Sequence, residues 1–290
     1  MAKGTKELKQ RITGVKNIQK ITRAMEMVAT QKLKRLQGRA EAARPYAEKV
    51  QQMVARLAGS VRSDLSPLLG ARDVKRRGHL VISADKGLCG GYNMNLARKA
   101  ITVLKSADGV ETRTHVLGTK GALLLEARGH RVDGLYEDVV EKLDFIRVRN
   151  ITREFVTAFL AGEIDELSLV YTGFESAARQ RPTTVSILPI RPDSLQTGDE
   201  GASAGADFII EPDAEALLKD LLPKFLEIKV YTAVLESLAS EFTARRNAMK
   251  QATDAANDMI EALTRQYNRA RQESITNELL EVVGGAEALK

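Results

Sequence analysis

Apolar residues in the amino-terminal part of the chain recur every seven positions. The row consists of Leu8, Val15, Thr22, Ala29 and Leu36, with Ile18 and Met25 between its members and Ile12, Ile21 and Val28 beside it. This spacing predicts a long helix with an apolar stripe of the coiled-coil type. Gly14 weakens the helix locally, and Pro45 is expected to kink or interrupt it one residue earlier. Residues 1–58 are therefore predicted to form an amino-terminal coiled-coil helix.

A longer seven-residue repeat runs through the carboxyl-terminal part of the chain. Its main row is Leu221, Ile228, Leu235, Phe242, Met249, Ala256, Leu263 and Ala270, and a second row is Tyr231, Leu238, Arg245, Ala252 and Met259. No glycine occurs from Ala206 to Val283, and Pro212 suits the first turn of a helix. The repeat predicts a helix over residues 208–290, over 100 Å long at about 1.5 Å per residue and bent at Pro223. Its stripe needs a partner, and the amino-terminal helix is the comparable candidate.

Residues 75–192 change to a shorter period. The β-rich runs are "HLVIS", "THVLG", "LSLVYTGF" and "TTVSILPI", and helical patterns occupy 93–106, 119–129 and "VRNITREFVTAFLAG". Alternation of strands and helices predicts a small α/β domain of Rossmann-like type. Residues 193–207, rich in Gly, Ser and Asp, are predicted to be a flexible loop that leads to the last helix. The predicted fold class is α/β, with this domain inserted between two long helices.

The order of these segments predicts their geometry. The ends of an inserted domain commonly lie close together, so the two long helices should run antiparallel as a coiled coil. If both start level at the insert, the last helix should project roughly 20 Å beyond the first. The projecting end contains an apolar group: Ile275, Leu279, Leu280, Val282 and Val283. Exposed apolar residues at a helix tip are typical of a binding surface, and a tip that frays or folds back is the alternative.

Charge and composition exclude several classes of protein. Residues 1–62 carry 15 Lys and Arg against 4 Asp and Glu, although the whole chain has a net charge of only +6. Nucleic acid is disfavoured as a partner, because no aromatic side chain precedes Tyr46 to stack on bases. The single cysteine and three scattered histidines disfavour a disulfide framework or a metal site. No apolar run reaches 18 residues, so direct membrane insertion is not expected.

The stretch "SADKGLCGGYN" at 83–93 lies between a predicted strand and a predicted helix, where phosphates are often bound. It contains neither GxxxxGK[ST] nor GxGxxG, and no catalytic constellation accompanies it. Gly87, Gly90 and Gly91 are better explained by a tight turn, and Cys89 by packing. We therefore expect no cofactor, no catalytic residue and no nucleotide site in this chain.

Three stretches, in the same order along the chain, resemble the gamma subunit of bacterial-type ATP synthase. They are "ITRAMEMVATQKLKRLQ" at 21–37, "SADKGLCGGYN" at 83–93 and "ITNELLEVVGGAEA" at 275–288. The resemblance implies a central rotor shaft that couples transmembrane proton flow to ATP synthesis or hydrolysis. It also implies three partners: the ring of three alpha and three beta subunits, the epsilon subunit and the ring of c subunits. The chain would then be a non-catalytic, peripheral subunit at the cytoplasmic face of the bacterial plasma membrane.

The same resemblance implies which residues contact the catalytic ring: Met25, Arg245, Gln272, Thr276 and Glu278. Met25 fits the helical stripe and could simply be core. Arg245 falls on an apolar row, where an unpaired charge costs stability, whereas the other three could be solvated surface. Two other classes stay open from the residues alone: a coiled-coil scaffold or tether carrying a small α/β module, and a small-molecule-binding α/β enzyme with helical arms.

Overall fold

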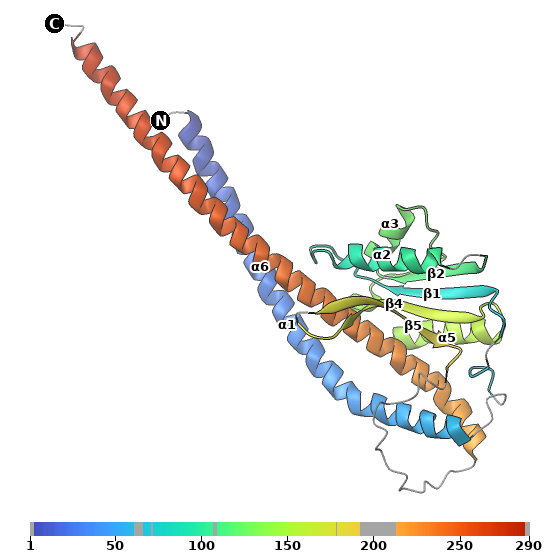
Figure 1. Ribbon diagram of the computed structural model, residues 1–290. Helices are drawn as coiled ribbons and strands as arrows, with labels where there is room; N and C mark the ends of the chain where they lie inside the picture. The colour runs from blue at the N-terminus through green and yellow to red at the C-terminus, as the bar shows by residue number, and fades with distance from the viewer. Residues whose placement is uncertain are drawn as a thin grey trace. The chain divides into compact units, whose positions relative to one another are not determined.

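The computed structural model describes residues 3–60, 66–70, 72–106, 109–177, 179–191 and 213–287 (Figure 1). The chain divides into two compact units, one of Met1–Gln31 with Arg245–Lys290 and one of Lys32–Ala244. Two long helices, α1 (Lys3–Ser60) and α6 (Ala214–Glu287), contribute residues to both units. The predicted fold class, an α/β sheet between two long helices, is confirmed.

The unit Lys32–Ala244 is built on a five-stranded sheet of order β3-β2-β1-β4-β5. The strands are β1 (Arg76–Ile82), β2 (Glu111–Leu117), β3 (Gly134–Tyr136), β4 (Glu166–Phe174) and β5 (Gln180–Leu188). The first four are parallel, and β5 pairs antiparallel with β4. The apolar run "HLVI" lies in the central strand β1, which has a neighbour on both sides and is buried on both faces.

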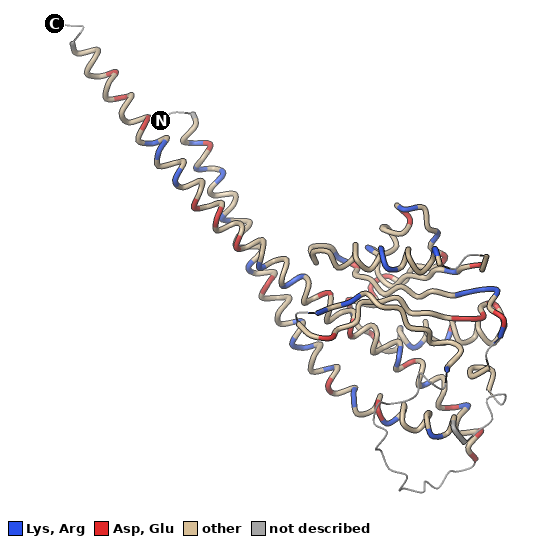
Figure 2. Tube along the Cα trace, viewed as in Figure 1, with Lys and Arg blue, Asp and Glu red and all other residues tan. Residues whose placement is uncertain are grey.

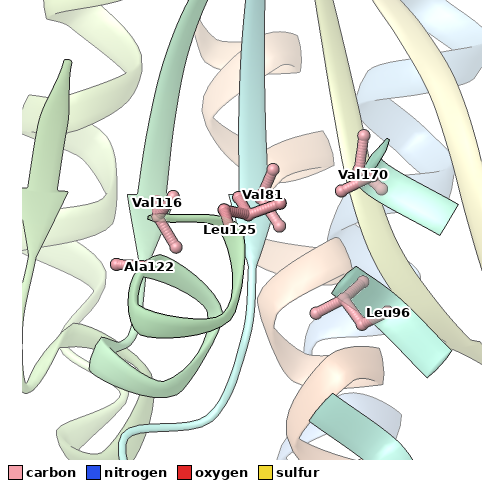
Figure 3. Packing of buried hydrophobic residues seen from close by; sticks show 7 residues of the cluster. Val81, Leu96, Val116, Ala122, Leu125 and Val170 are labelled. Atoms are coloured by element: carbon pink, nitrogen blue, oxygen red, sulfur yellow. The ribbon is translucent and has the colours of Figure 1, made fainter. Parts of the chain in front are cut away.

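Four shorter helices accompany the sheet: α2 (Tyr92–Lys105), α3 (Thr119–Glu126), α4 (Val139–Lys142) and α5 (Phe145–Leu160). Val81 pairs with Val116 on one side and Val170 on the other. Residues paired across a sheet point to the same face, so these three valines form a row. Leu96 of α2 and Leu125 of α3 pack on that row to form a core cluster (Figure 3).

Two short elements in this unit were not predicted. β3 has three residues and no alternating pattern, and α4 has one turn between Asp138 and Leu143, which both have positive φ. Elements this short carry too few side chains to establish a period. The strands and helices that were predicted for this unit are confirmed, although β1 begins at Arg76, ahead of its apolar run.

The close approach of α3 to β1 depends on two glycines. The Ser83 Oγ donates to the carbonyl oxygens of Leu117 and Gly118 and accepts from the Gly121 N–H, at 2.9–3.0 Å. Gly118 has φ +94°, and a Cβ added there would lie 2.4 Å from the Ser83 carbonyl oxygen. A Cβ on Gly121 would lie 2.4 Å from the Ser83 Oγ. Side chains at either glycine would therefore force β1 and α3 apart.

Both long helices continue through their prolines. Of the two outcomes expected at Pro45, a kink or an interruption, the interruption is wrong, since α1 extends from Lys3 to Ser60 as one helix. α6 likewise continues through Pro223. A helix interior that loses one backbone hydrogen bond can persist where packing on both sides supports it. α6 begins at Ala214, later than predicted, because Asp213 caps it by accepting the Ala216 N–H at 2.8 Å. Pro212 and the predicted loop 193–207 lie outside the described residues.

The seven-residue row of α6 is confirmed along its length. Every member is buried or half-buried: Leu221, Ile228, Leu235, Phe242, Met249, Ala256, Leu263 and Ala270. The second row holds as far as Ala252 and fails at Met259, which is 52 % exposed.

The predicted stripe of α1 is correct for its main row and wrong for three of its flanking residues. Thr22, Ala29 and Leu36 are buried, and Leu8 and Val15 are half-buried. Ile18, Ile21 and Val28 instead face solvent, with 52–59 % of their surface exposed. The side chains that α1 presents to α6 therefore include smaller and more polar residues than the sequence pattern alone would select.

Candidate functional site: the paired ends of the long helices

The unit Met1–Gln31 with Arg245–Lys290 is an antiparallel helix pair. Gln19 Nε2 donates to Asn257 Oδ1, and the hydroxyls of Thr22 and Thr253 lie 2.8 Å apart. The residue numbers in these two pairs add up to 276 and 275, which defines the register of the pair. Lys3, where α1 begins, is then level with about residue 272 of α6.

α6 consequently extends past the start of α1. Residues 273–287 lie beyond the level of Lys3 and span about 22 Å at 1.5 Å per residue. This length agrees with the overhang of roughly 20 Å predicted from the sequence. The apolar group of the tip is exposed, with exposed fractions from 49 % at Ile275 to 70 % at Val282; the values of Leu279, Leu280 and Val283 lie between these. We call residues 273–287 the overhang.

The polar residues expected to contact a partner occupy the same end of α6. Gln272, Thr276 and Glu278 are all exposed. Gln272 and Thr276 line a shallow groove on the helix surface with Arg269, Glu273 and Asn277. Glu278 accepts a hydrogen bond from the Ser274 hydroxyl at 3.3 Å. The overhang thus carries an apolar group next to exposed polar side chains, and it lies beyond the level at which α1 begins.

Met25 and Arg245 lie within the helix pair, at a different level from the overhang. The register places Met25 level with Lys250 and Arg245 level with Thr30. Met25 is half-buried, whereas Arg245 is 8 % exposed, so most of its side chain is packed inside the chain. The five residues named from the resemblance therefore form two groups, one in the paired region and one on the overhang.

Charge is distributed unequally between the two helix segments (Figure 2). Residues 3–31 carry seven Lys and Arg against two Glu, and residues 245–287 carry six against seven Asp and Glu. Within this basic segment of α1, the exposed row Ile18, Ile21 and Val28 is the feature that the sequence pattern missed. A basic and apolar surface of this kind suits a partner that is acidic and apolar.

The turn at 83–93 uses its polar groups for its own packing. Asn93 Oδ1 accepts the Ala84 N–H at 3.2 Å, and the Tyr92 hydroxyl lies 2.7 Å from the Ser237 hydroxyl of α6. Of the three glycines expected to allow the turn, only Gly90 has positive φ. Leu88, two residues earlier, also adopts a positive φ of +61°, and its side chain is exposed. Cys89 is buried, as expected for a packing residue. The geometry is that of a structural turn that joins β1 to α2 and to α6.

Titratable groups near this turn have shifted pKa values. Glu141 accepts a hydrogen bond from Lys86 at 2.7 Å, which lowers the pKa of that carboxyl, and Lys32 of α1 lies 3.7 Å from the same oxygen. Burial raises the pKa of the Tyr92 phenol, and the Glu241 carboxylate acts in the same direction. These contacts tie α1, the turn and α4 together within the unit Lys32–Ala244.

His79 is the least satisfied polar side chain of the sheet. It is 1 % exposed, and neither ring nitrogen has a hydrogen-bond partner among the described residues. Burial lowers the pKa of its imidazole to about 4, and the Arg77 charge acts in the same direction. In the part of the chain that the structure describes, no three or more His, Cys, Asp and Glu side chains lie close enough together to hold a metal ion. Among the same residues, no helix is long and apolar enough to cross a membrane.

Solved structures with this fold come from the rotors of ATP synthases. The rotor of the Euglena gracilis mitochondrial enzyme in rotational state 1 matches with a TM-score of 0.65 at 19 % identity, over 94 % of this chain and 99 % of that chain. A second Euglena gracilis structure, of the OSCP/F1/c-ring in rotational state 3, matches with a TM-score of 0.67 at 20 % identity, over 99 % of this chain and 94 % of that chain. The fold is therefore that of ATP synthase central-stalk proteins.

Sequence comparison narrows this class to one family. Residues 4–289 match the family described as ATP synthase. The chain is 44 % identical to the ATP synthase gamma chain of Moorella thermoacetica over 285 residues, which cover 98 % of this chain and 99 % of that protein. It is 41 % identical to the gamma chain of Heliobacterium modesticaldum over 292 residues, which cover 99 % of each. The chain belongs to the ATP synthase gamma chain family.

Proposed function

We propose that this chain is the rotor shaft of an ATP synthase, turning inside a ring of three alpha and three beta subunits. Rotation would couple transmembrane proton flow to ATP synthesis, or ATP hydrolysis to proton pumping. The observation that carries the proposal is that α6 extends past the start of α1 in the helix pair. The overhang that results presents an apolar group to solvent. Membership of the gamma chain family supplies the complex in which such a surface would be covered.

The asymmetry of the helix pair supplies the mechanism. Three catalytic subunits of identical sequence adopt identical states unless something without threefold symmetry contacts them. The two segments present different surfaces, since α1 is strongly basic with an exposed apolar row and α6 is nearly neutral. Each catalytic subunit would therefore meet a different surface and be biased towards a different nucleotide affinity. Rotation passes each bias to the next subunit.

The contacts with the ring are assigned to two levels of the shaft. Gln272, just before the overhang, and Thr276 and Glu278 within it would contact the ring at one level, and Met25 and Arg245 would contact it from the paired region. Ile275, Leu279, Leu280, Val282 and Val283 would form an apolar axle tip in a sleeve made by the ring. Apolar contacts suit such a bearing because they are not directional, so their free energy changes little as the tip turns.

The remaining assignments follow the family resemblance. The chain itself would be non-catalytic, with nucleotides bound by the alpha and beta subunits. The epsilon subunit and the c ring would be its other partners. It would be held as a peripheral protein at the cytoplasmic face of a bacterial plasma membrane, with no segment of its own inserted in the bilayer.

Reconstitution with alpha and beta subunits tests this function. The full chain should co-purify with three copies of each, and ATP hydrolysis by the complex should rotate a probe fixed to the α/β unit. The matched control is a chain ending at Arg271, which keeps the helix pair and loses the overhang. A scaffold or tether would bind the alpha and beta subunits without rotating, and an enzyme of another class would be active without the ring. Either result would contradict the proposal.

A further inference from the structure

Between residues 18 and 29, α1 carries one apolar row and one mostly polar row, and the mostly polar row faces α6. The exposed row consists of Ile18, Ile21 and Val28, with half-buried Met25 at its edge. The row turned towards α6 consists of Gln19, Thr22, Glu26 and Ala29, each of them buried or half-buried. The two rows are offset by one residue, which is about 100° around a helix of 3.6 residues per turn.

Between residues 18 and 29, where the main row holds only Thr22 and Ala29, hydrophobic burial would favour the opposite orientation, whereas Leu8 and Val15 nearer the start of α1 favour the observed one. Two isoleucines and a valine have a much larger transfer free energy than a glutamine, a threonine and an alanine. A rotation of α1 by about 100° would bring the richer row against α6. A specific restraint in this stretch would therefore add to the packing of Leu8 and Val15 in holding the observed orientation.

Hydrogen bonds across the pair provide that restraint. Gln19 Nε2 donates to Asn257 Oδ1, and the Thr22 and Thr253 hydroxyls are 2.8 Å apart in a buried layer one turn away. These hydroxyls also lie 3.0 Å from the Gln19 carbonyl oxygen and 2.9 Å from the Met249 carbonyl oxygen, respectively. Either proton arrangement keeps one bond across the helices and one within a helix, so the layer is satisfied in this orientation. Rotation would break both cross-helix pairs and leave the buried Thr253 hydroxyl without its partner on α1.

We propose that Gln19 and Thr22, with Asn257 and Thr253, form a rotational lock that holds the Ile18, Ile21 and Val28 row outward. The lock is a positioning device, because a coiled-coil stripe by itself does not decide which of two adjacent rows is buried. It keeps an apolar surface available at a stability cost. What that surface contacts rests on the proposed function, whereas the lock itself is a property of this helix pair.

Thiol labelling of the isolated full-length chain tests the lock. Gly14 lies on the outward side, four residues before Ile18, and a Cβ there meets open space, so Gly14→Cys reports that side. Val15→Cys, on the neighbouring half-buried row, reports the inward side. Buried Cys89 stays in place, and the parent chain supplies its background rate. In the native lock, position 14 should be alkylated much faster than position 15.

The lock is broken by Gln19→Ala with Thr22→Ala. We expect alkylation at position 14 to fall and at position 15 to rise, so that their ratio drops about fivefold or more as the richer row turns inward. Thr30→Ala with Gln31→Ala is the matched control, since both residues are exposed and the Thr30 hydroxyl bonds only within its helix, to the Glu26 carbonyl oxygen. This control and the hydroxyl-retaining Thr22→Ser should leave the ratio unchanged.

The two reporters separate rotation from loosening. If both rates rise together in the Gln19→Ala, Thr22→Ala chain, the pair has merely frayed and the lock is wrong. Unchanged rates at both positions overturn it equally, since the orientation would then not depend on these side chains. The assay needs no other subunit, so its result is independent of whether the chain turns inside a catalytic ring.

Discussion

The stability of the α/β unit should depend on pH through His79. The unfolded chain has an ordinary histidine pKa of 6.5, whereas burial holds the folded value at about 4. Because the folded pKa is the lower one, the unfolded state binds the proton more readily, and stability is lost as the pH falls from 6.5 towards 4. The full shift corresponds to roughly 3 kcal/mol, of which about 2 kcal/mol is lost by pH 5.

The geometry explains the size of this effect. His79 lies in the central strand β1, opposite Thr114 of β2 and Ser168 of β4, both of which are also buried. Arg77 lies two residues away on the same strand and disfavours a second positive charge, whereas the Glu166 carboxylate partly offsets it. Because neither ring nitrogen has a hydrogen-bond partner in the described part of the chain, no acceptor there stabilises the protonated imidazole.

Urea unfolding of the full chain and of His79→Leu measures the contribution. The free energy of unfolding should be compared at pH 7 and pH 5 by tyrosine fluorescence, since Tyr92 and Tyr171 report the α/β unit. The parent should lose about 2 kcal/mol more than His79→Leu between these pH values, and removal of the unsatisfied nitrogens should leave the variant at least as stable at pH 7. If the parent and His79→Leu lost equal stability, the imidazole would already be satisfied in the native sheet and the reasoning would fail.

Three further predictions concern the rotor contacts and the packing of the sheet. Ending the chain before Gly284 should leave assembly and ATP-driven proton pumping largely intact, whereas ending it at Arg271 should weaken both. If the shorter deletion, from Gly284, abolished both, the tip would make specific contacts that hold it in place, and the bearing idea would be wrong. Met25→Lys should leave assembly unchanged and lower the protons pumped per ATP hydrolysed, because a long cation can form an ion pair that holds one rotary state; an unaltered ratio would contradict this. Gly118→Ala should cost about 3 kcal/mol or more by thermal unfolding, against roughly 1 kcal/mol for Gly129→Ala, which shares the positive φ but has open space around it.

The sequence by itself determined the architecture wherever a periodic signal was long. The seven-residue row of α6, from Leu221 to Ala270, was correct at every member, because a repeat of that length leaves one helical face as the only continuous apolar surface. The change to strand and helix alternation likewise located the α/β domain, and the two helix lengths gave the overhang at the end of α6. Three separate motifs were enough to indicate the family.

The tertiary structure decided what depends on residues far apart in the chain. Between residues 18 and 29 the buried face of α1 was ambiguous, since Ile18 and Ile21 are more apolar than Gln19 and Thr22. Which row faces α6 follows from the hydrogen bonds to Asn257 and Thr253, more than 200 positions away. The need for glycine at 118 arises only because Ser83 lies against it. Local propensity and period act over a few turns, whereas orientation, close approach and the satisfaction of buried polar groups are set by the partner across the interface, which no single stretch of sequence contains.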